Sequence, residues 1–152
     1  MTTITATATA APATAAPVTA ATAKAGRART VRRVAWLANA LFWTAFAVLE
    51  GVNHGWLAVL LAVVFFIAPD LTFLAGARDA HKVEKGQLPA RAVPYYNAAH
   101  RALVPVALIA IYTVVPFTWA PIFAGMCGWL AHISFDRAFG YGLRTKDGFQ
   151  RR

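Results

Sequence analysis

Four apolar segments of membrane-span length constrain this chain more than any other feature of its sequence. Each is roughly 17–21 residues long, which suits a hydrocarbon core about 30 Å thick. Strands with unpaired edges cannot cross lipid, and the alternating pattern of a membrane β-barrel is missing. The sequence therefore predicts an all-α, polytopic membrane protein, an antiparallel bundle of four transmembrane helices joined by short connections. The segments are residues 34–50, 56–75, 95–115 and 119–139.

The low content of charged residues predicts that the lipid bilayer is the main partner of this protein. Only 14% of the residues are charged, whereas soluble domains carry about 25%. The net charge of +9 does not indicate a nucleic-acid partner, because the basic residues form no aromatic-interleaved face and no known binding motif. A single cysteine, Cys127, lies inside an apolar segment, which predicts a packing role and no disulfide framework.

The placement of the basic residues predicts the topology. Lys and Arg precede the first span, occupy the loop 76–94 and follow the fourth span, whereas the connections 51–55 and 116–118 have none. By the positive-inside rule both termini and the loop 76–94 face the cytoplasm, which predicts a multi-pass protein of the cell's inner (plasma) membrane. The basic residues outside the spans include Lys24, Arg27, Arg29, Arg32, Arg33, Arg78, Lys82, Lys85, Arg91, Arg144, Lys146, Arg151 and Arg152.

The composition also divides the chain. Residues 1–30 are rich in Ala, Thr and Pro and are expected to form a disordered tail, because they have few large side chains to bury. Residues 31–145 are expected to form the transmembrane domain, and residues 146–152 a basic C-terminal tail. The first segment lacks the Leu-rich core of a secretory signal, but its lack of acidic residues leaves an organelle transit peptide as an alternative.

Five polar residues in the spans are expected at one depth near the cytoplasmic leaflet. A rise of 1.5 Å per residue places Asp70 roughly 9 Å inside the boundary, with His100 at a similar depth on the next span. His132 and Asp136 are four residues apart and share one helix face, while Asn97 lies three residues before His100. An unpaired carboxylate at the centre of a membrane helix is unfavourable by about 2.5–3.5 kcal/mol, so these acids need a partner.

Three explanations of the polar layer stay open at this point. The first is a divalent-metal site of Asp70, His100, His132 and Asp136, supported by Asn97; nitrogen and oxygen ligands favour Zn, Mn or Fe over Ca. The second is a set of interhelical salt bridges in which Arg101 and Arg137 pair with the acids. The third is a path for protons or a solute. A haem is not expected beside two acids.

Three motifs in these segments carry a family resemblance. They are APDL (68–71), YNAAH (96–100) and AHISFDRAFGYGLR (131–144), and they resemble those of a bacterial membrane protein family of unknown function, number 4260 in its series. The resemblance implies a four-helix membrane protein and leaves its activity open. The loop 76–94 is longer than the family pattern, and the Ala/Thr tail has no counterpart. The matching positions are Pro69, Asp70, Tyr96, Asn97, His100, His132, Asp136, Arg137, Gly140, Tyr141, Gly142 and Leu143.

Two functions follow from these observations, and the sequence does not decide whether the protein is an enzyme. A metal at this depth would support hydrolase-type chemistry on a membrane-associated substrate, with Arg101 or Arg137 binding an anionic headgroup and Tyr141 at the membrane surface. The ligand types are similar to those of small membrane-bound metal-dependent hydrolases, an analogy without a motif match. The alternative is a non-catalytic assembly subunit or small carrier, whose polar layer only locks helix packing.

Overall fold

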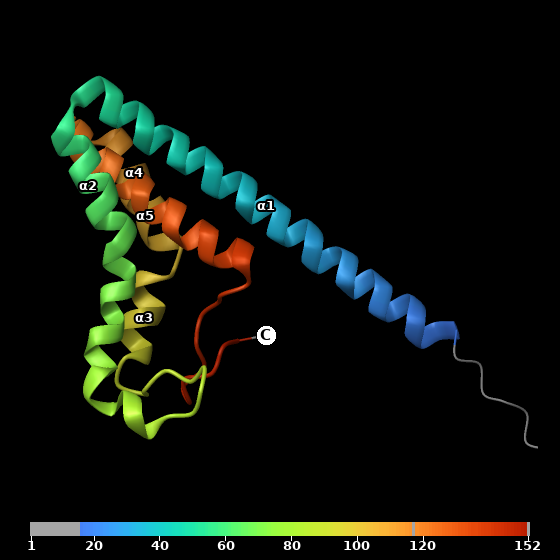
Figure 1. The fold of residues 1–152 in the computed structure, drawn as a ribbon. Coiled ribbons are helices and arrows are strands. Elements are labelled where there is room, and N and C mark those ends of the chain that lie inside the picture. Colours follow the sequence, from blue (N-terminus) through green and yellow to red (C-terminus); the bar gives the residue numbers. More distant parts are fainter. Residues whose placement is uncertain (1–15, 117, 152) are drawn as a thin grey trace, which may run out of the picture. The chain divides into compact units, whose positions relative to one another are not determined.

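The computed structural model describes residues 16–116 and 118–151, and within them the fold is all-α (Figure 1). The chain divides into two units, Met1–Val31 and Arg32–Arg152. All the packing described below lies within the second unit. The elements are α1 (Ala16–His54), α2 (Trp56–Ile67), the 3-10 helix η1 (Ala68–Lys82), α3 (Val93–Ala99), α4 (Leu103–Val114) and α5 (Ala120–Phe139).

Helix α1 begins inside the segment that the composition predicts to be a disordered tail. Residues 1–15 of that segment lie outside the described residues, and residues 16–30 are helical. Alanine has the highest intrinsic helix propensity, and the segment from Ala16 to Ala28 is rich in it. This local preference explains why the helix extends well before the first apolar span.

Two helical segments are long and apolar enough to cross a membrane, Thr22–His54 and Trp56–Lys82. Helices α3 and α4 make a third candidate if this bent pair forms one span. The second segment exposes large apolar side chains along its length, the kind of surface that lipid covers in a membrane. These side chains belong to Val59, Leu60, Val63, Val64, Phe66, Ile67, Leu71, Phe73 and Leu74.

Helix α5 packs closely against α2 and is the most buried helix of this unit. The contact is built from small residues, with Ala58 and Ala62 of α2 against Ala124 of α5. At Gly128 the backbone of Ala62 occupies the space that a Cβ atom would need. Small residues allow this close approach of two helix backbones, which is how membrane helices commonly associate.

The single helix expected over residues 95–115 is divided into α3 and α4, which are bent by 42° relative to each other. Pro105 explains the break, because its ring has no N–H and clashes with the carbonyl of the residue four positions earlier, Arg101. Two carbonyl oxygens at the break accept hydrogen bonds from α5 instead. The Nε1–H group of Trp129 donates to Ala99 at 2.7 Å, and Arg137 donates to His100 at 3.0 Å.

The residues after α5 pack back against the loop that precedes α3. Gly140 ends α5 in the left-handed conformation (φ 97°), a common helix terminus because glycine has no Cβ atom. Farther on, the backbone N–H of Leu88 donates to the carbonyl of Gly148 at 3.0 Å, and Gln87 donates to that of Asp147 at 2.7 Å. Residues 146–151, expected as part of a basic tail, are therefore held against this loop.

Candidate metal centre

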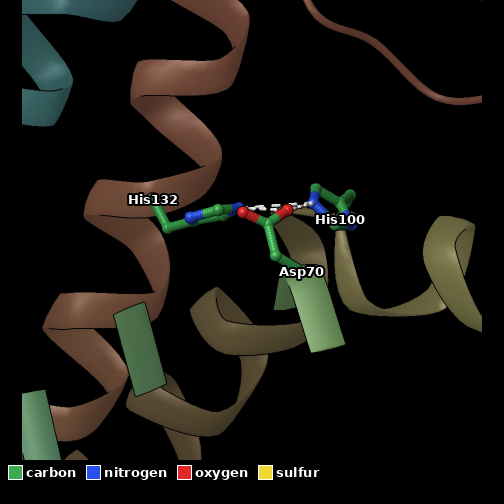
Figure 2. Close-up of side chains that lie close together, drawn as sticks. All are labelled: Asp70, His100 and His132. Atoms are coloured by element: carbon green, nitrogen blue, oxygen red, sulfur yellow. Dashed lines mark hydrogen bonds and ion pairs between the residues drawn. The ribbon is translucent and has the colours of Figure 1, made fainter. Parts of the chain in front are cut away.

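Asp70, His100 and His132 meet in one cluster although they come from three separate elements (Figure 2). Asp70 lies in the first turn of η1, His100 lies at the break between α3 and α4, and His132 lies on α5. The Nε2 atoms of the two imidazoles are 3.3 Å apart. The Oδ1 atom of Asp70 is 3.6 Å from each of them. One ligand atom from each residue therefore points to a common centre.

Asp136 adds a second carboxylate to the same centre. Its Oδ2 atom is 3.4 Å from Nε2 of His100 and 3.9 Å from Nε2 of His132. The two imidazoles are 1% and 7% exposed, whereas the side chains of Asp70 and Asp136 are 50% and 22% exposed. The cluster thus has a buried nitrogen side and a more open carboxylate side. All four residues predicted as ligands lie within this small volume.

The local structure around Tyr96 sets the orientation of His100. The Nδ1 atom of His100 lies 2.9 Å from the carbonyl oxygen of Tyr96, and because a carbonyl can only accept, Nδ1 carries the hydrogen. In the neutral ring Nε2 then keeps its lone pair and faces the cluster. The Tyr96 ring stacks on the imidazole, with centroids 3.8 Å apart. A histidine held in this way is prepared to be a metal ligand, because the bond made by one nitrogen fixes the role of the other.

His132 approaches the centre from the opposite side, on the buried face of α5. The ring of Phe66 meets its imidazole edge to face, with centroids 5.3 Å apart. In the metal-free protein the Nε2–H group of His132 can donate to the lone pair of His100, which accounts for the 3.3 Å contact. A bound cation would replace that hydrogen and accept both lone pairs.

The distances of the cluster match those of a small coordination sphere. Tetrahedral Zn with metal–ligand bonds of about 2.0–2.1 Å places its ligand atoms about 3.3–3.4 Å apart. The two shortest separations, 3.3 Å between the imidazoles and 3.4 Å from His100 to Asp136, fall in this range. The separations of 3.6–3.9 Å need a closing movement of only a few tenths of an ångström. Asp70, His100 and His132 could therefore hold a metal ion.

The contacts of the two acids agree less well with salt bridges to arginine than with a metal site. Among residues 16–116 and 118–151, the close contacts of the Asp70 and Asp136 carboxylates with basic side chains, at 3.4–3.9 Å, are with His100 and His132, and none is with an arginine. Arg101 is exposed at the surface. Arg137 donates to backbone carbonyls. Neither arginine therefore forms a direct salt bridge with Asp70 or Asp136.

Asn97 and Tyr141, two of the residues predicted to support the centre or bind a substrate, take part in hydrogen bonds with the backbone. Asn97 pairs with the backbone of Arg144, accepting from its N–H at 2.7 Å and donating to its carbonyl at 3.0 Å. It therefore fastens the C-terminal segment to α3. Tyr141 is exposed, and its carbonyl accepts from Arg137 at 3.1 Å. Their part in substrate binding stays a prediction.

Three residues beside the cluster, Tyr96, Trp129 and Arg144, were not among the predicted site residues. Tyr96 lies four residues before His100, and this helical spacing could have suggested a contact between the two side chains. The guanidinium of Arg144 lies over the Tyr96 ring, 5.5 Å from its centroid. Trp129 is three residues before His132 and bonds to the backbone at the break. No sequence period indicates the last two contacts, because they depend on the helix break and on the return of the C-terminal segment.

The fold and the site define an all-α protein with candidate membrane-spanning helices and an Asp–His–His group, with both histidines buried, that could hold a metal. The chain belongs to a family described as a domain of unknown function, DUF4260, whose model matches residues 30–152. This match confirms the resemblance that the three motifs indicate. Searches of curated proteins and of solved structures give no match.

Proposed function

We propose that this chain is a membrane protein whose Asp–His–His group binds a catalytic divalent metal ion, Zn, Mn or Fe. Asp70, His100 and His132 are the ligands, and Asp136 is the fourth. The 3.3 Å separation of the two Nε2 atoms carries the proposal, because it equals the ligand–ligand distance expected around a tetrahedral metal. The backbone bond that fixes the His100 tautomer supports it as well.

The proposal includes four membrane spans with both termini and the loop 76–94 in the cytoplasm. The distribution of Lys and Arg supports this topology. The fourth span is α5, whose 20 residues extend about 30 Å at 1.5 Å per residue. Its small and polar residues then face neighbouring helices rather than lipid. We assign residues 31–145 to the membrane domain, in the cell's inner (plasma) membrane.

The proposed chemistry is hydrolysis of a membrane-associated substrate at the cytoplasmic leaflet. A metal in this cluster supplies Lewis acidity toward a water molecule or a substrate oxygen. The half-exposed carboxylate of Asp70 marks the side from which a substrate reaches the centre. Arg101, exposed and next to His100 in the chain, is available for an anionic group. A lipid phosphate suits this depth and this charge.

The test is metal-dependent turnover of a lipid substrate. Detergent-purified protein loaded with Zn, Mn or Fe is mixed with phospholipid micelles, and release of phosphate or of the headgroup is followed. We expect turnover by the wild type, its loss in His132→Ala, and its retention in Cys127→Ala. Cys127 is a matched control because it is also buried on α5 but lies outside the cluster. A protein that binds stoichiometric metal without any turnover would favour the non-catalytic alternative.

A further inference from the structure

Arg137 makes two hydrogen bonds that connect the candidate metal centre with the segment after α5. Its Nη2 atom donates to the carbonyl oxygen of His100 at 3.0 Å, and its Nη1 atom donates to the carbonyl oxygen of Tyr141 at 3.1 Å. The first carbonyl belongs to a cluster residue at the break between α3 and α4. The second lies just after the end of α5. One guanidinium thus connects two irregular pieces of backbone.

The helix break explains why the carbonyl of His100 needs this donor. In a continuous helix it would accept from the N–H group four residues later, that of Val104. Here the N–H group of Val104 donates to Arg101 at 3.0 Å. A carbonyl without a partner inside a membrane protein is unfavourable by several kcal/mol. Arg137 therefore replaces the lost helical bond, and does so at the residue whose imidazole faces the cluster.

The turn that the guanidinium holds at Tyr141 is also bonded to the backbone of Asp136, the residue that supplies the second carboxylate. Asp136 directly precedes Arg137, and its carbonyl accepts from the N–H of Tyr141 at 2.7 Å. The backbone of Asp136, the Tyr141 turn and the carbonyl of His100 are consequently held in one local framework. A shift of Arg137 would change the distance between His100 and Asp136, whose side chains now lie 3.4 Å apart.

We infer that Arg137 is a positioning residue of the metal centre, which fixes the backbone of His100 through the planar fork of its guanidinium. The inference rests on the proposed metal site and gives Arg137 a different task from binding an anionic headgroup. Arginine presents parallel donors in a rigid plane, whereas lysine is a flexible point charge. Lysine at this position would keep the positive charge but could not bridge both carbonyls in the same geometry.

The experiment measures Co²⁺ binding, because the visible spectrum of this ion reports its ligand geometry without any need for activity. Detergent-purified wild type, Arg137→Lys, Arg137→Ala and the exposed loop control Arg78→Lys are titrated with Co²⁺, and circular dichroism records their helical content. We expect Arg137→Lys to bind about 10- to 100-fold more weakly, with an altered spectrum and unchanged helical content. Added guanidinium ion, but not ammonium ion, should restore binding in Arg137→Ala. Arg78→Lys should match the wild type.

Two results would overturn the inference. One is an Arg137→Lys protein with wild-type affinity and spectrum, since the charge alone would then be sufficient. The other is loss of helical content in Arg137→Lys, which would assign Arg137 to the fold as a whole. A wild type that binds no Co²⁺ and no native metal is a distinct outcome, because it overturns the proposed function and this inference with it.

Discussion

Tyr96 and His100 are joined by two contacts, a ring stack with centroids 3.8 Å apart and a bond of 2.9 Å from Nδ1 of His100 to the carbonyl of Tyr96. Together they fix both the plane of the imidazole and the nitrogen that carries its hydrogen. Two residues four positions apart, Tyr96 and His100, thus leave an imidazole lone pair facing the cluster. The proposed metal binding depends on this orientation of ligand side chains by neighbouring residues.

The first prediction concerns Asn97, which fastens the C-terminal segment to α3. Asn97→Ala removes two hydrogen bonds to the Arg144 backbone, each worth about 0.5–1.5 kcal/mol. The C-terminal segment should then open more often, and trypsin should cleave faster after Lys146. Time-resolved proteolysis with mass spectrometry measures this rate. Asn53→Ala, at an exposed position, is the control, and equal cleavage rates for the two variants would contradict the prediction.

The second prediction concerns the close approach of α2 and α5. Gly128→Ala places a Cβ atom against the Ala62 backbone and should lower stability by about 1–3 kcal/mol, as overpacking usually does. Gly26→Ala is the matched control, because this helical glycine has open space around it. Thermal unfolding in detergent compares the two. A Gly128→Ala protein as stable as the control would mean that the helices do not approach as closely as described.

The third prediction is the topology. Single cysteines replace Asn53 or Lys82 in a Cys127→Ala background, and intact cells are treated with a membrane-impermeant maleimide. The position-53 cysteine should react, and the position-82 cysteine should react only after the membrane is opened, because the basic loop faces the cytoplasm. The opposite labelling pattern would reverse the proposed orientation.

The fourth prediction concerns the N-terminal segment. Deleting residues 2–24 should leave membrane insertion and stability unchanged, because the helix packing and the candidate site lie in Arg32–Arg152. Terminal segments outside the packed unit generally tolerate truncation. Membrane fractions of cells that express both forms provide the comparison. Loss of membrane-integrated protein after the deletion would instead identify this segment as a targeting signal.

Helical spacing and charge placement predicted the membership of the cluster. His132 and Asp136 share a face because they are four residues apart, and the basic loops bring Asp70 and His100 to a similar depth. The bundle of four spans and its orientation go beyond the two or three candidate spans of the structure, so they stay predictions. The family membership could be predicted because its motifs are the same residues that form the cluster.

The helix break and the C-terminal return could not be predicted in the same way. Pro105 signals a possible break, but the donors that satisfy the freed carbonyls, Trp129 and Arg137, become apparent only once α5 lies beside it. Residues 140–151 have no helical or strand period, and their path depends on contacts such as that of Gly148 with Leu88. For this reason the sequence does not indicate the hydrogen bonds of Asn97 to the Arg144 backbone, nor those of Arg137 to the carbonyls of His100 and Tyr141.

The most direct measurement is the metal content of the purified protein. Wild type, Asp136→Asn, His132→Ala and the control Cys127→Ala are purified in detergent, supplemented with Zn, Mn and Fe, and analysed for bound elements. The account predicts about one metal ion per chain in the wild type and in Cys127→Ala. It predicts strongly reduced metal in Asp136→Asn and His132→Ala, with helical content retained, because a ligand is lost while the fold remains. A wild type without stoichiometric metal after supplementation would contradict the central claim.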